Sequence, residues 1–193
     1  MSQERQHIPL ILGMYEEYLE NQDLVSFAHA VLNRYLPGTL ARLTSHSKCE
    51  VRQAAILSLG LIGDFEVNHT VGRAMQDNDH TVRRLAEKGI RSIWNRDGNK
   101  THRRALADTI RLNAAGEYRD AYEKATKLLH DVPGFAEVWY QRGSACFQMK
   151  KYGQAIHDWH QALEFNPYHF VAATAMGEVY LRLGELVSAL DAF

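Results

Sequence analysis

The feature that most constrains the fold is a repeat of 34 residues in the C-terminal half of the chain. Residues of the same kind recur at this interval in successive copies: Ala121, Ala155 and Ala189; Pro133 and Pro167; Gly143 and Gly177; Trp159 and Phe193. A fixed period of this size is typical of stacked helix pairs, in which each pair buries its apolar face against its neighbours. We therefore predict an all-α fold, an α-α solenoid.

Each position of the 34-residue pattern has a packing reason. Gly143 lacks a Cβ atom, so a partner helix can approach closely, and Ala155 is small for the same reason on the second helix. Trp159 lies four residues after Ala155, on the same helical face, and is expected to fill the remaining space. Pro167 cannot continue a regular helix and is expected to end the second one after Asn166.

The pattern of the second copy resembles the tetratricopeptide repeat. It reads Trp139-x-x-Arg142-Gly143-x-x-Cys146, then Ala155-x-x-x-Trp159, then Pro167. The third copy supplies Met176-Gly177-x-x-Tyr180, whereas the first, roughly residues 104–133, is degenerate. The resemblance implies about two and a half helix–turn–helix units in a right-handed α-α superhelix (solenoid), a kind of stack that usually binds other proteins.

A second period, of 31 residues, precedes the first. Equivalent positions are Val51-Arg52 and Val82-Arg83, Ala55 and Ala86, Leu59 and Ile90, and Ile62 and Ile93. The segment 51–64 resembles a HEAT repeat of the short type found in phycobilisome lyases. Ser47 and Glu50 have the spacing of a capping box, and Gly63 is placed to end the helix. Residues 7–35 are expected to form an irregular helical pair that caps this array.

The two periods predict two regions, a HEAT-like array over residues 1–97 and a tetratricopeptide array over residues 98–193. The polar, turn-rich stretch Asp97-Gly98-Asn99-Lys100 marks the boundary. The combination resembles a group of bacterial proteins that carry both repeats, with no reaction assigned. Phe193 falls inside the last repeat. We therefore expect either a longer natural protein or a homo-oligomer that covers this uncapped end.

Composition indicates a soluble protein, the cysteines suggest a cytoplasmic location, and no cofactor is expected. The formal net charge is −1, and 46% of the residues are hydrophobic. No apolar run reaches the roughly 20 residues that cross a bilayer, and the N-terminus lacks the pattern of a secretory signal. Cys49 and Cys146 have no Cys-x-x-Cys partner and are expected to be buried, reduced thiols.

The tetratricopeptide resemblance implies a concave groove lined by the first helix of each pair. Carried onto this sequence, the groove-facing positions are Leu106, Ile110, Glu137, Tyr140, Gln141, Ser144, Phe147, Val171, Thr174, Glu178 and Arg182. Apolar groups interleaved with polar ones suit a peptide or protein segment with apolar anchor side chains. The alternative is that Tyr140 and Phe147 pack within the superhelix.

One subclass of such grooves is argued against by the sequence. Some of these domains hold the C-terminal carboxylate of a heat-shock chaperone with Lys, Asn and Arg side chains. The corresponding positions here carry no cation: Leu106, Ile110, Gln141, Val171 and Ala175. A chaperone co-factor of that type is therefore not expected.

The segment 82–104 carries the clearest excess of positive charge. Arg84, Lys88 and Arg91 recur at intervals of four and three and share a helical face. This stripe is a candidate surface for nucleic acid or an acidic protein. The alternative is a solvated helix face, with Arg83 pairing with an acidic residue of a neighbouring repeat. The pI of about 6.8 and the lack of a nucleic-acid-binding motif favour this alternative.

No motif of the sequence predicts catalysis or a metal site. His157 and His160 lie three residues apart, but His-Asp-Trp-His is not the His-Glu-x-x-His pattern, and no third ligand is evident. A remote alternative is a lyase or chaperone for a tetrapyrrole protein, suggested by the lyase-type HEAT pattern alone. We expect a protein-binding scaffold that is not an enzyme.

Overall fold

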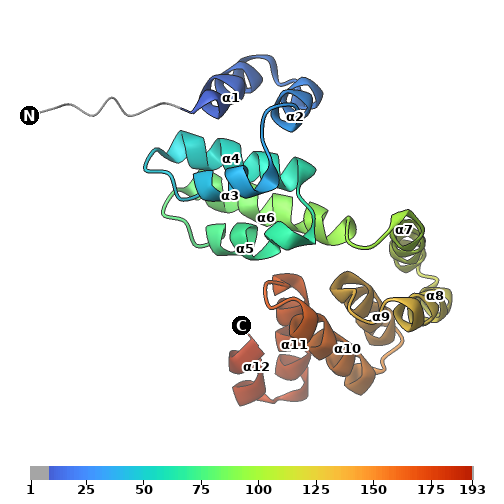
Figure 1. Ribbon diagram of the computed structural model, residues 1–193. Helices are drawn as coiled ribbons and strands as arrows, with labels where there is room; N and C mark the ends of the chain where they lie inside the picture. Colours follow the sequence, from blue (N-terminus) through green and yellow to red (C-terminus); the bar gives the residue numbers. More distant parts are fainter. Residues whose placement is uncertain (1–8, 193) are drawn as a thin grey trace, which may run out of the picture. The chain divides into compact units, whose positions relative to one another are not determined.

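Every regular element in the computed structural model, which describes residues 9–192, is a helix (Figure 1). The prediction of an all-α fold is confirmed. Phe193, the large residue of the third repeat, lies outside the described residues. Contacts within the chain divide it into two compact units, which we call unit 1 (Met1–Trp94) and unit 2 (Asn95–Phe193). None of the helices within residues 9–192 combines the length and the apolar character needed to cross a membrane.

Unit 1 consists of three helix pairs. In chain order its elements are α1 (Leu10–Asn21), α2 (Leu24–Leu32), α3 (Pro37–Leu43), α4 (Cys49–Ile62), the 3₁₀ helix η1 (Phe65–Val67), α5 (Asn68–Ala74) and α6 (His80–Asn95). Helix α4 contacts α1, α2, α3 and α5, so it is the centre of this unit. Its side chains Val51, Ala55 and Leu59 are fully buried, as the 31-residue period predicts.

Two equivalent arginines fix the turns that precede α4 and α6. Arg52 donates from Nη1 to the carbonyl oxygens of His46 and Ser47, at 3.0 and 3.2 Å. Arg83, 31 residues later, donates to the corresponding carbonyls of Asp77 and Asn78, at 2.7 and 3.0 Å. The two repeats therefore share contacts as well as spacing.

Arg52 also joins the two repeats to each other. Its Nε and Nη2 atoms each donate to a carboxylate oxygen of Asp77 at 2.8 Å. Both side chains are largely buried. The expectation that Arg83 pairs with an acidic residue is thus wrong within the described contacts, because Arg83 binds backbone carbonyls and the pairing belongs to Arg52.

Backbone contact between two glycines brings α4 and α6 together. A Cβ atom placed on Gly60 would lie 2.7 Å from the Cα atom of Gly89. No side chain fits between backbones at this distance, so both positions require glycine. The 31-residue period did not reveal this contact, because the two glycines are not equivalent in the repeat.

Of the two predicted ends of α4, the C-terminal end is correct and the N-terminal end is wrong. Gly63 is the C-cap residue, as expected. The capping box of Ser47 and Glu50 is wrong, because α4 starts at Cys49 and its N-cap, Lys48, makes no side-chain capping bond. The Ser47 carbonyl instead accepts from Arg52, which holds this residue outside the helix.

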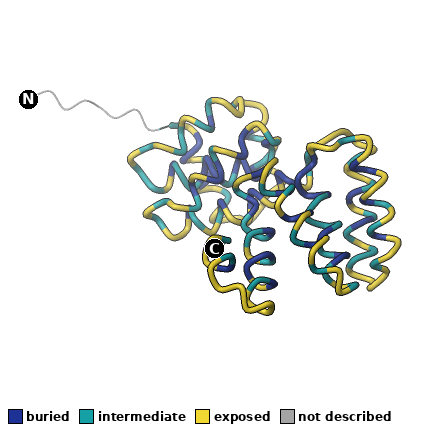
Figure 2. The backbone as a smooth tube through the Cα atoms, turned by 90° about the horizontal axis from the view of Figure 1, so that it is seen from below, coloured by how far each residue is buried: buried dark blue, intermediate teal, exposed yellow. Residues whose placement is uncertain are grey.

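Unit 2 is a succession of antiparallel helices in which each contacts the next (Figure 1). They are α7 (Lys100–Ala115), α8 (Tyr118–Asp131), α9 (Ala136–Gln148), α10 (Tyr152–Phe165), α11 (Phe170–Leu183) and α12 (Leu186–Ala192). Buried and exposed residues alternate along these helices (Figure 2). Helix α10 ends before Asn166 and Pro167, as the repeat predicts.

Gly143 and Trp159 pack as the 34-residue pattern predicts. A Cβ atom on Gly143 would lie 2.6 Å from the indole Nε1 of Trp159, which is 2% exposed. The same indole N–H donates to the carbonyl oxygen of Tyr140 at 3.3 Å. The ring therefore fills the space over Gly143 and ties α10 to α9.

A buried ion pair strengthens the same α9–α10 contact. Arg142 donates from Nε and Nη2 to the two carboxylate oxygens of Asp158, each at 2.8 Å. The Arg142 guanidinium carbon also lies 4.6 Å from the ring centre of Trp139 and 5.6 Å from that of Tyr122. Two hydrogen bonds and two aromatic rings thus compensate the burial of this charge.

Candidate functional site

The predicted groove residues lie on three first helices of unit 2, which together form what we call the α7/α9/α11 face. Helix α7 contacts α9 directly, and the side chains of α9 and the start of α11 are joined by hydrogen bonds. The predicted groove residues differ in how deeply they are buried on this face. Some belong to the core and others to the surface.

A chain of polar side chains runs across this face. The Asn113 amide of α7 donates to the carbonyl and to the side-chain Oε1 of Gln141, at 2.9 and 3.0 Å. Gln141 donates in turn to Glu137 at 2.8 Å, and the other Glu137 oxygen lies 3.1 Å from Nε2 of His169. Four polar residues therefore connect three helix pairs.

His169 anchors this chain at the start of α11. Its Nδ1 accepts the backbone N–H of Ala172 at 3.2 Å, which makes His169 the N-cap residue of α11. Since Nδ1 acts as an acceptor, the ring hydrogen is on Nε2 and points to the Glu137 carboxylate. Both side chains are buried. Glu137, predicted to line the groove, is therefore a structural residue instead.

Two further predicted positions serve packing. Leu106 is 1% exposed and lies in the core between α7, α8 and α9, so it is not available to a partner. Ile110 packs against the same core and is half-buried.

Tyr140 and Phe147 combine packing with partial exposure. The Tyr140 ring lies 5.0 Å from the His169 ring, measured between centres. Phe147 packs against Tyr152 and Trp159, and the guanidinium of Arg182 lies 5.2 Å from its ring centre. Both aromatic side chains are half-buried, so each has one edge at the surface.

The remaining predicted positions are at the surface. Thr174, Glu178 and Arg182 are exposed and follow one another at intervals of four residues on α11, so they share one side of that helix. Val171 and Ser144 are half-buried. The Ser144 hydroxyl donates to the Tyr140 carbonyl at 2.9 Å. The accessible part of the face is therefore polar, with aromatic edges from α9.

The polar chain contains one buried atom whose hydrogen-bonding capacity is unused. Within residues 9–192 the Asn113 side-chain oxygen has no hydrogen-bond partner, although its amide group makes two bonds. Sequence reasoning missed Asn113, His169 and their link through Gln141. These residues are not separated by the repeat period, so no spacing signal could have found them.

The basic stripe of unit 1 is at the surface, as its spacing suggests. Arg84, Lys88 and Arg91 are all exposed and line one hollow on α6. Glu87 lies in the same hollow, and its carboxylate is 3.8 Å from Arg91. The stripe therefore carries two cations without a carboxylate partner among the described side chains, Arg84 and Lys88.

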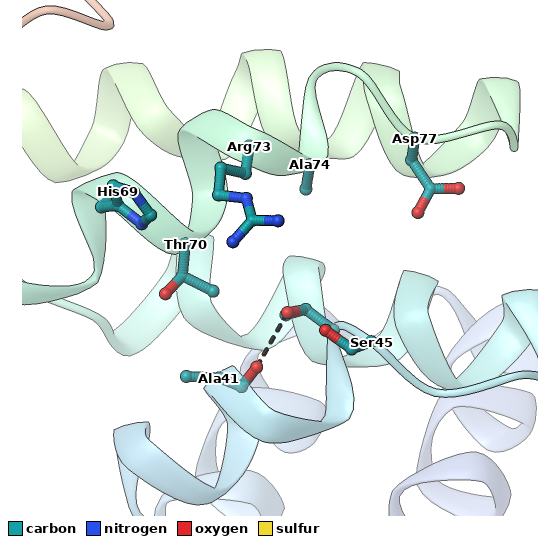
Figure 3. Close-up of a pocket in the computed structure, with 8 residues that line it drawn as sticks. Ala41, Ser45, His69, Thr70, Arg73, Ala74 and Asp77 are labelled. Atoms are coloured by element: carbon teal, nitrogen blue, oxygen red, sulfur yellow. Dashed lines mark hydrogen bonds between the residues drawn. The ribbon is translucent and has the colours of Figure 1, made fainter.

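A polar pocket of about 270 Å³ lies between α3 and α5 and was not anticipated from the sequence (Figure 3). Its walls include the Arg73 and His69 side chains together with Thr70 and Ser45. The Thr44 hydroxyl donates to the Ala41 carbonyl at its edge, at 2.8 Å. Asp77 also borders it but is engaged by Arg52, which leaves a pocket of hydroxyl and basic groups.

The two histidines of α10 lie on its exposed side. His160 is 3.3 Å from the Tyr180 hydroxyl, and the rings of His157 and Trp139 are nearly perpendicular, with centres 6.4 Å apart. Among residues 9–192 no three His, Cys, Asp or Glu side chains are grouped so that they could hold a metal ion. Cys49 and Cys146 are both free thiols, but the predicted burial holds for Cys146 alone, since Cys49 is half-buried.

Burial controls the chemistry of Cys146. It raises the pKa of this thiol to about 11, and the nearby Asp158 carboxylate acts in the same direction. The thiol is fully buried and is therefore neutral and inaccessible at physiological pH. This site does not offer a nucleophile.

Comparison with known proteins identifies part of unit 2. Residues 136–169, which span α9 and α10, match the family model for the tetratricopeptide repeat. The solved structure of MamA RS-1 ArsTM double mutant is similar at 15% sequence identity, covering 95% of this chain and 89% of that chain, with a TM-score of 0.46. No curated protein sequence matches the chain. The chain thus contains a tetratricopeptide repeat, a unit that serves protein–protein interaction in general.

Proposed function

We propose that the protein is an adaptor that holds a peptide or protein segment on the α7/α9/α11 face, without a reaction of its own. The observation that carries this proposal is the hydrogen-bonded chain from Asn113 through Gln141 and Glu137 to His169. It fixes three helices relative to one another. A surface held in this way needs little ordering on binding, which favours affinity.

The accessible side chains suit a partner with both apolar and polar groups. The half-buried Tyr140 and Phe147 offer aromatic edges for an apolar side chain, and Thr174 and Glu178 offer hydrogen-bonding groups beside them. Arg182 is held over Phe147 and adds one positive charge. The face therefore suits a mixed segment better than a C-terminal carboxylate alone.

We further propose that residues 1–97 form a HEAT-like array and residues 98–193 a tetratricopeptide array. The equivalent carbonyl contacts of Arg52 and Arg83 support a true repeat in the first region. The two free thiols agree with a reducing compartment such as the cytoplasm.

Selection of binders from a displayed random-peptide library tests the proposed function. Selected peptides are then titrated against wild type and against Thr174→Arg/Glu178→Arg, which changes two exposed side chains of α11. The matched control is Gln154→Arg/Glu164→Arg, the same change in charge on exposed positions of α10. We expect the α11 variant to bind at least about tenfold more weakly and the control to bind as wild type does. Equal loss in both variants, or none in either, would overturn the proposal.

A further inference from the structure

Unit 1 contains an apolar pocket of about 130 Å³ between α1, α2, α4 and α6. Its walls include Tyr18 and four leucines, Leu24, Leu57, Leu61 and Leu85, and Ser92 and Lys88 add polar groups. Gly60 and Gly89, whose backbones touch, are buried and close its inner side. The pocket exists because the two glycines place no side chain between α4 and α6.

The pocket has the size and lining of a receptor for one side chain. A cavity of roughly 150 Å³ with a comparable aliphatic lining binds benzene in another protein. A single leucine or phenylalanine side chain is of similar size. Leu24 is 39% exposed, whereas Leu57, Leu61 and Leu85 are half-buried, so the leucine walls reach the surface.

Positive charge adjoins this pocket. Lys88 and Leu85 line both the apolar pocket and the hollow that contains Arg84 and Arg91. In the described part of the chain neither Arg84 nor Lys88 has a carboxylate partner. Glu87, the acid that lines the same hollow, lies against Arg91.

We propose that this site, which we call the α4/α6 pocket, binds an acidic peptide segment that carries one apolar anchor side chain. The anchor enters between the leucines, and carboxylates on either side of it face Arg84, Lys88 and Arg91. Arg84 and Arg91 are separated by about two helical turns, roughly 10 Å. An extended peptide covers that distance in about three residues, so the carboxylates lie within two positions of the anchor.

The apolar lining favours such a peptide over nucleic acid. A phosphate backbone would satisfy the cations but would leave the leucine pocket exposed to water. Conversely, an uncharged apolar segment would fill the pocket and leave two cations unpaired. An acidic segment with one anchor uses both features of the site.

Fluorescence anisotropy with four labelled peptides tests the proposal. The first is Glu-Asp-Leu-Asp-Glu, and the second replaces Leu with Ala. The third replaces each acid with its amide, and the fourth replaces Leu with Phe.

We expect the first and fourth peptides to bind, and the second and third to bind roughly tenfold more weakly or worse. Equal binding of the first two peptides would overturn the proposal, because the apolar pocket would then have no part. A single-stranded thymidine oligonucleotide that displaces the first peptide and binds more tightly would overturn it in favour of nucleic acid.

Two variants locate the site. Arg84→Gln/Lys88→Gln removes the two unpaired cations, and Arg34→Gln/Arg42→Gln removes two exposed cations elsewhere in unit 1. We expect the first variant to bind the Leu peptide roughly tenfold more weakly and the second to match wild type, with unchanged circular dichroism in both. Equal loss in the two variants, or no measurable binding to wild type, would overturn the proposal. This outcome is separate from that for the α7/α9/α11 face, which involves none of these residues.

Discussion

The two units bring helices together in opposite ways. In unit 1, α4 and α6 meet backbone to backbone at Gly60 and Gly89, and no side chain lies between them. In unit 2, Gly143 instead makes room for the large ring of Trp159, which fills the space between α9 and α10. The first contact depends on the absence of a side chain, and the second depends on the presence of one.

The difference extends to polar contacts. Arg52 and Arg83 of unit 1 bind the carbonyls of adjacent turns and thereby shape the chain between helices. In unit 2 the Glu137–His169 contact joins α9 to the start of α11. Each unit also holds one buried arginine–aspartate pair, Arg52–Asp77 in unit 1 and Arg142–Asp158 in unit 2. Substitutions of opposite kinds, enlarging in unit 1 and truncating in unit 2, should therefore be the damaging ones.

The largest effect is expected for Trp159→Ala. Removing this buried ring leaves a cavity between α9 and α10, and we expect a loss of about 3–5 kcal/mol in the free energy of unfolding. Urea denaturation followed by circular dichroism measures it, with the exposed Glu164→Ala on the same helix as control. A change below about 1 kcal/mol would show that the ring does not hold the repeat together.

The next effect is expected for Asp158→Asn. This substitution leaves the largely buried Arg142 guanidinium without a countercharge, at a cost of about 3 kcal/mol. Asp108→Asn breaks the Asp108–Lys124 pair, whose side chains are 37–39% exposed, so water compensates and the change should be much smaller. Similar losses in the two variants, measured by urea denaturation, would contradict the special role of the buried pair.

A smaller loss in the free energy of unfolding is expected for Gly60→Ala, and Gly13→Ala serves as its control. The added methyl group would collide with the Gly89 backbone, which cannot move aside as a side chain can, and overpacking of this kind costs about 1–3 kcal/mol. Gly13→Ala in α1 meets nothing within 4 Å and should instead stabilise the helix by about 0.5–1 kcal/mol. Urea denaturation followed by circular dichroism measures both variants. Two shifts of the same sign would refute the close contact.

The smallest effect concerns pH. Hydrogen bonds from Arg52 hold the pKa of Asp77 below its ordinary value. The unfolded chain therefore binds this proton more readily, and the stabilisation is present above about pH 4 and lost as the pH falls through the folded pKa. Urea denaturation between about pH 5 and pH 2 should show a flatter pH dependence of stability for Asp77→Asn than for wild type. Identical slopes would mean that Asp77 is not linked to folding.

The sequence predicts contacts that follow a repeat period and misses those that do not. The pairing of Gly143 with Trp159 follows from the 34-residue pattern, and the equivalence of Arg52 and Arg83 follows from the 31-residue pattern. Contacts between non-equivalent positions need the three-dimensional path of the chain, as the Gly60–Gly89 contact shows.

Prediction of the candidate site from the sequence has the same limit. Exposure of Thr174, Glu178 and Arg182 agrees with their predicted place on a first helix. Burial of Glu137 was not predictable, because its partner His169 belongs to the turn that precedes the next helix pair. The misassigned capping box of Ser47 has a similar cause, since the local motif competes with the arginine that holds the turn.

Photo-crosslinking in cells that naturally produce the protein tests the central claim most directly. A photoreactive amino acid replaces Glu178 on α11 or, as the control, Glu164 on α10, both exposed positions. We predict one reproducible adduct from position 178, lost when Thr174→Arg is added, and no adduct from position 164. An adduct from position 164 with none from position 178 would place the partner away from the α7/α9/α11 face and contradict the account.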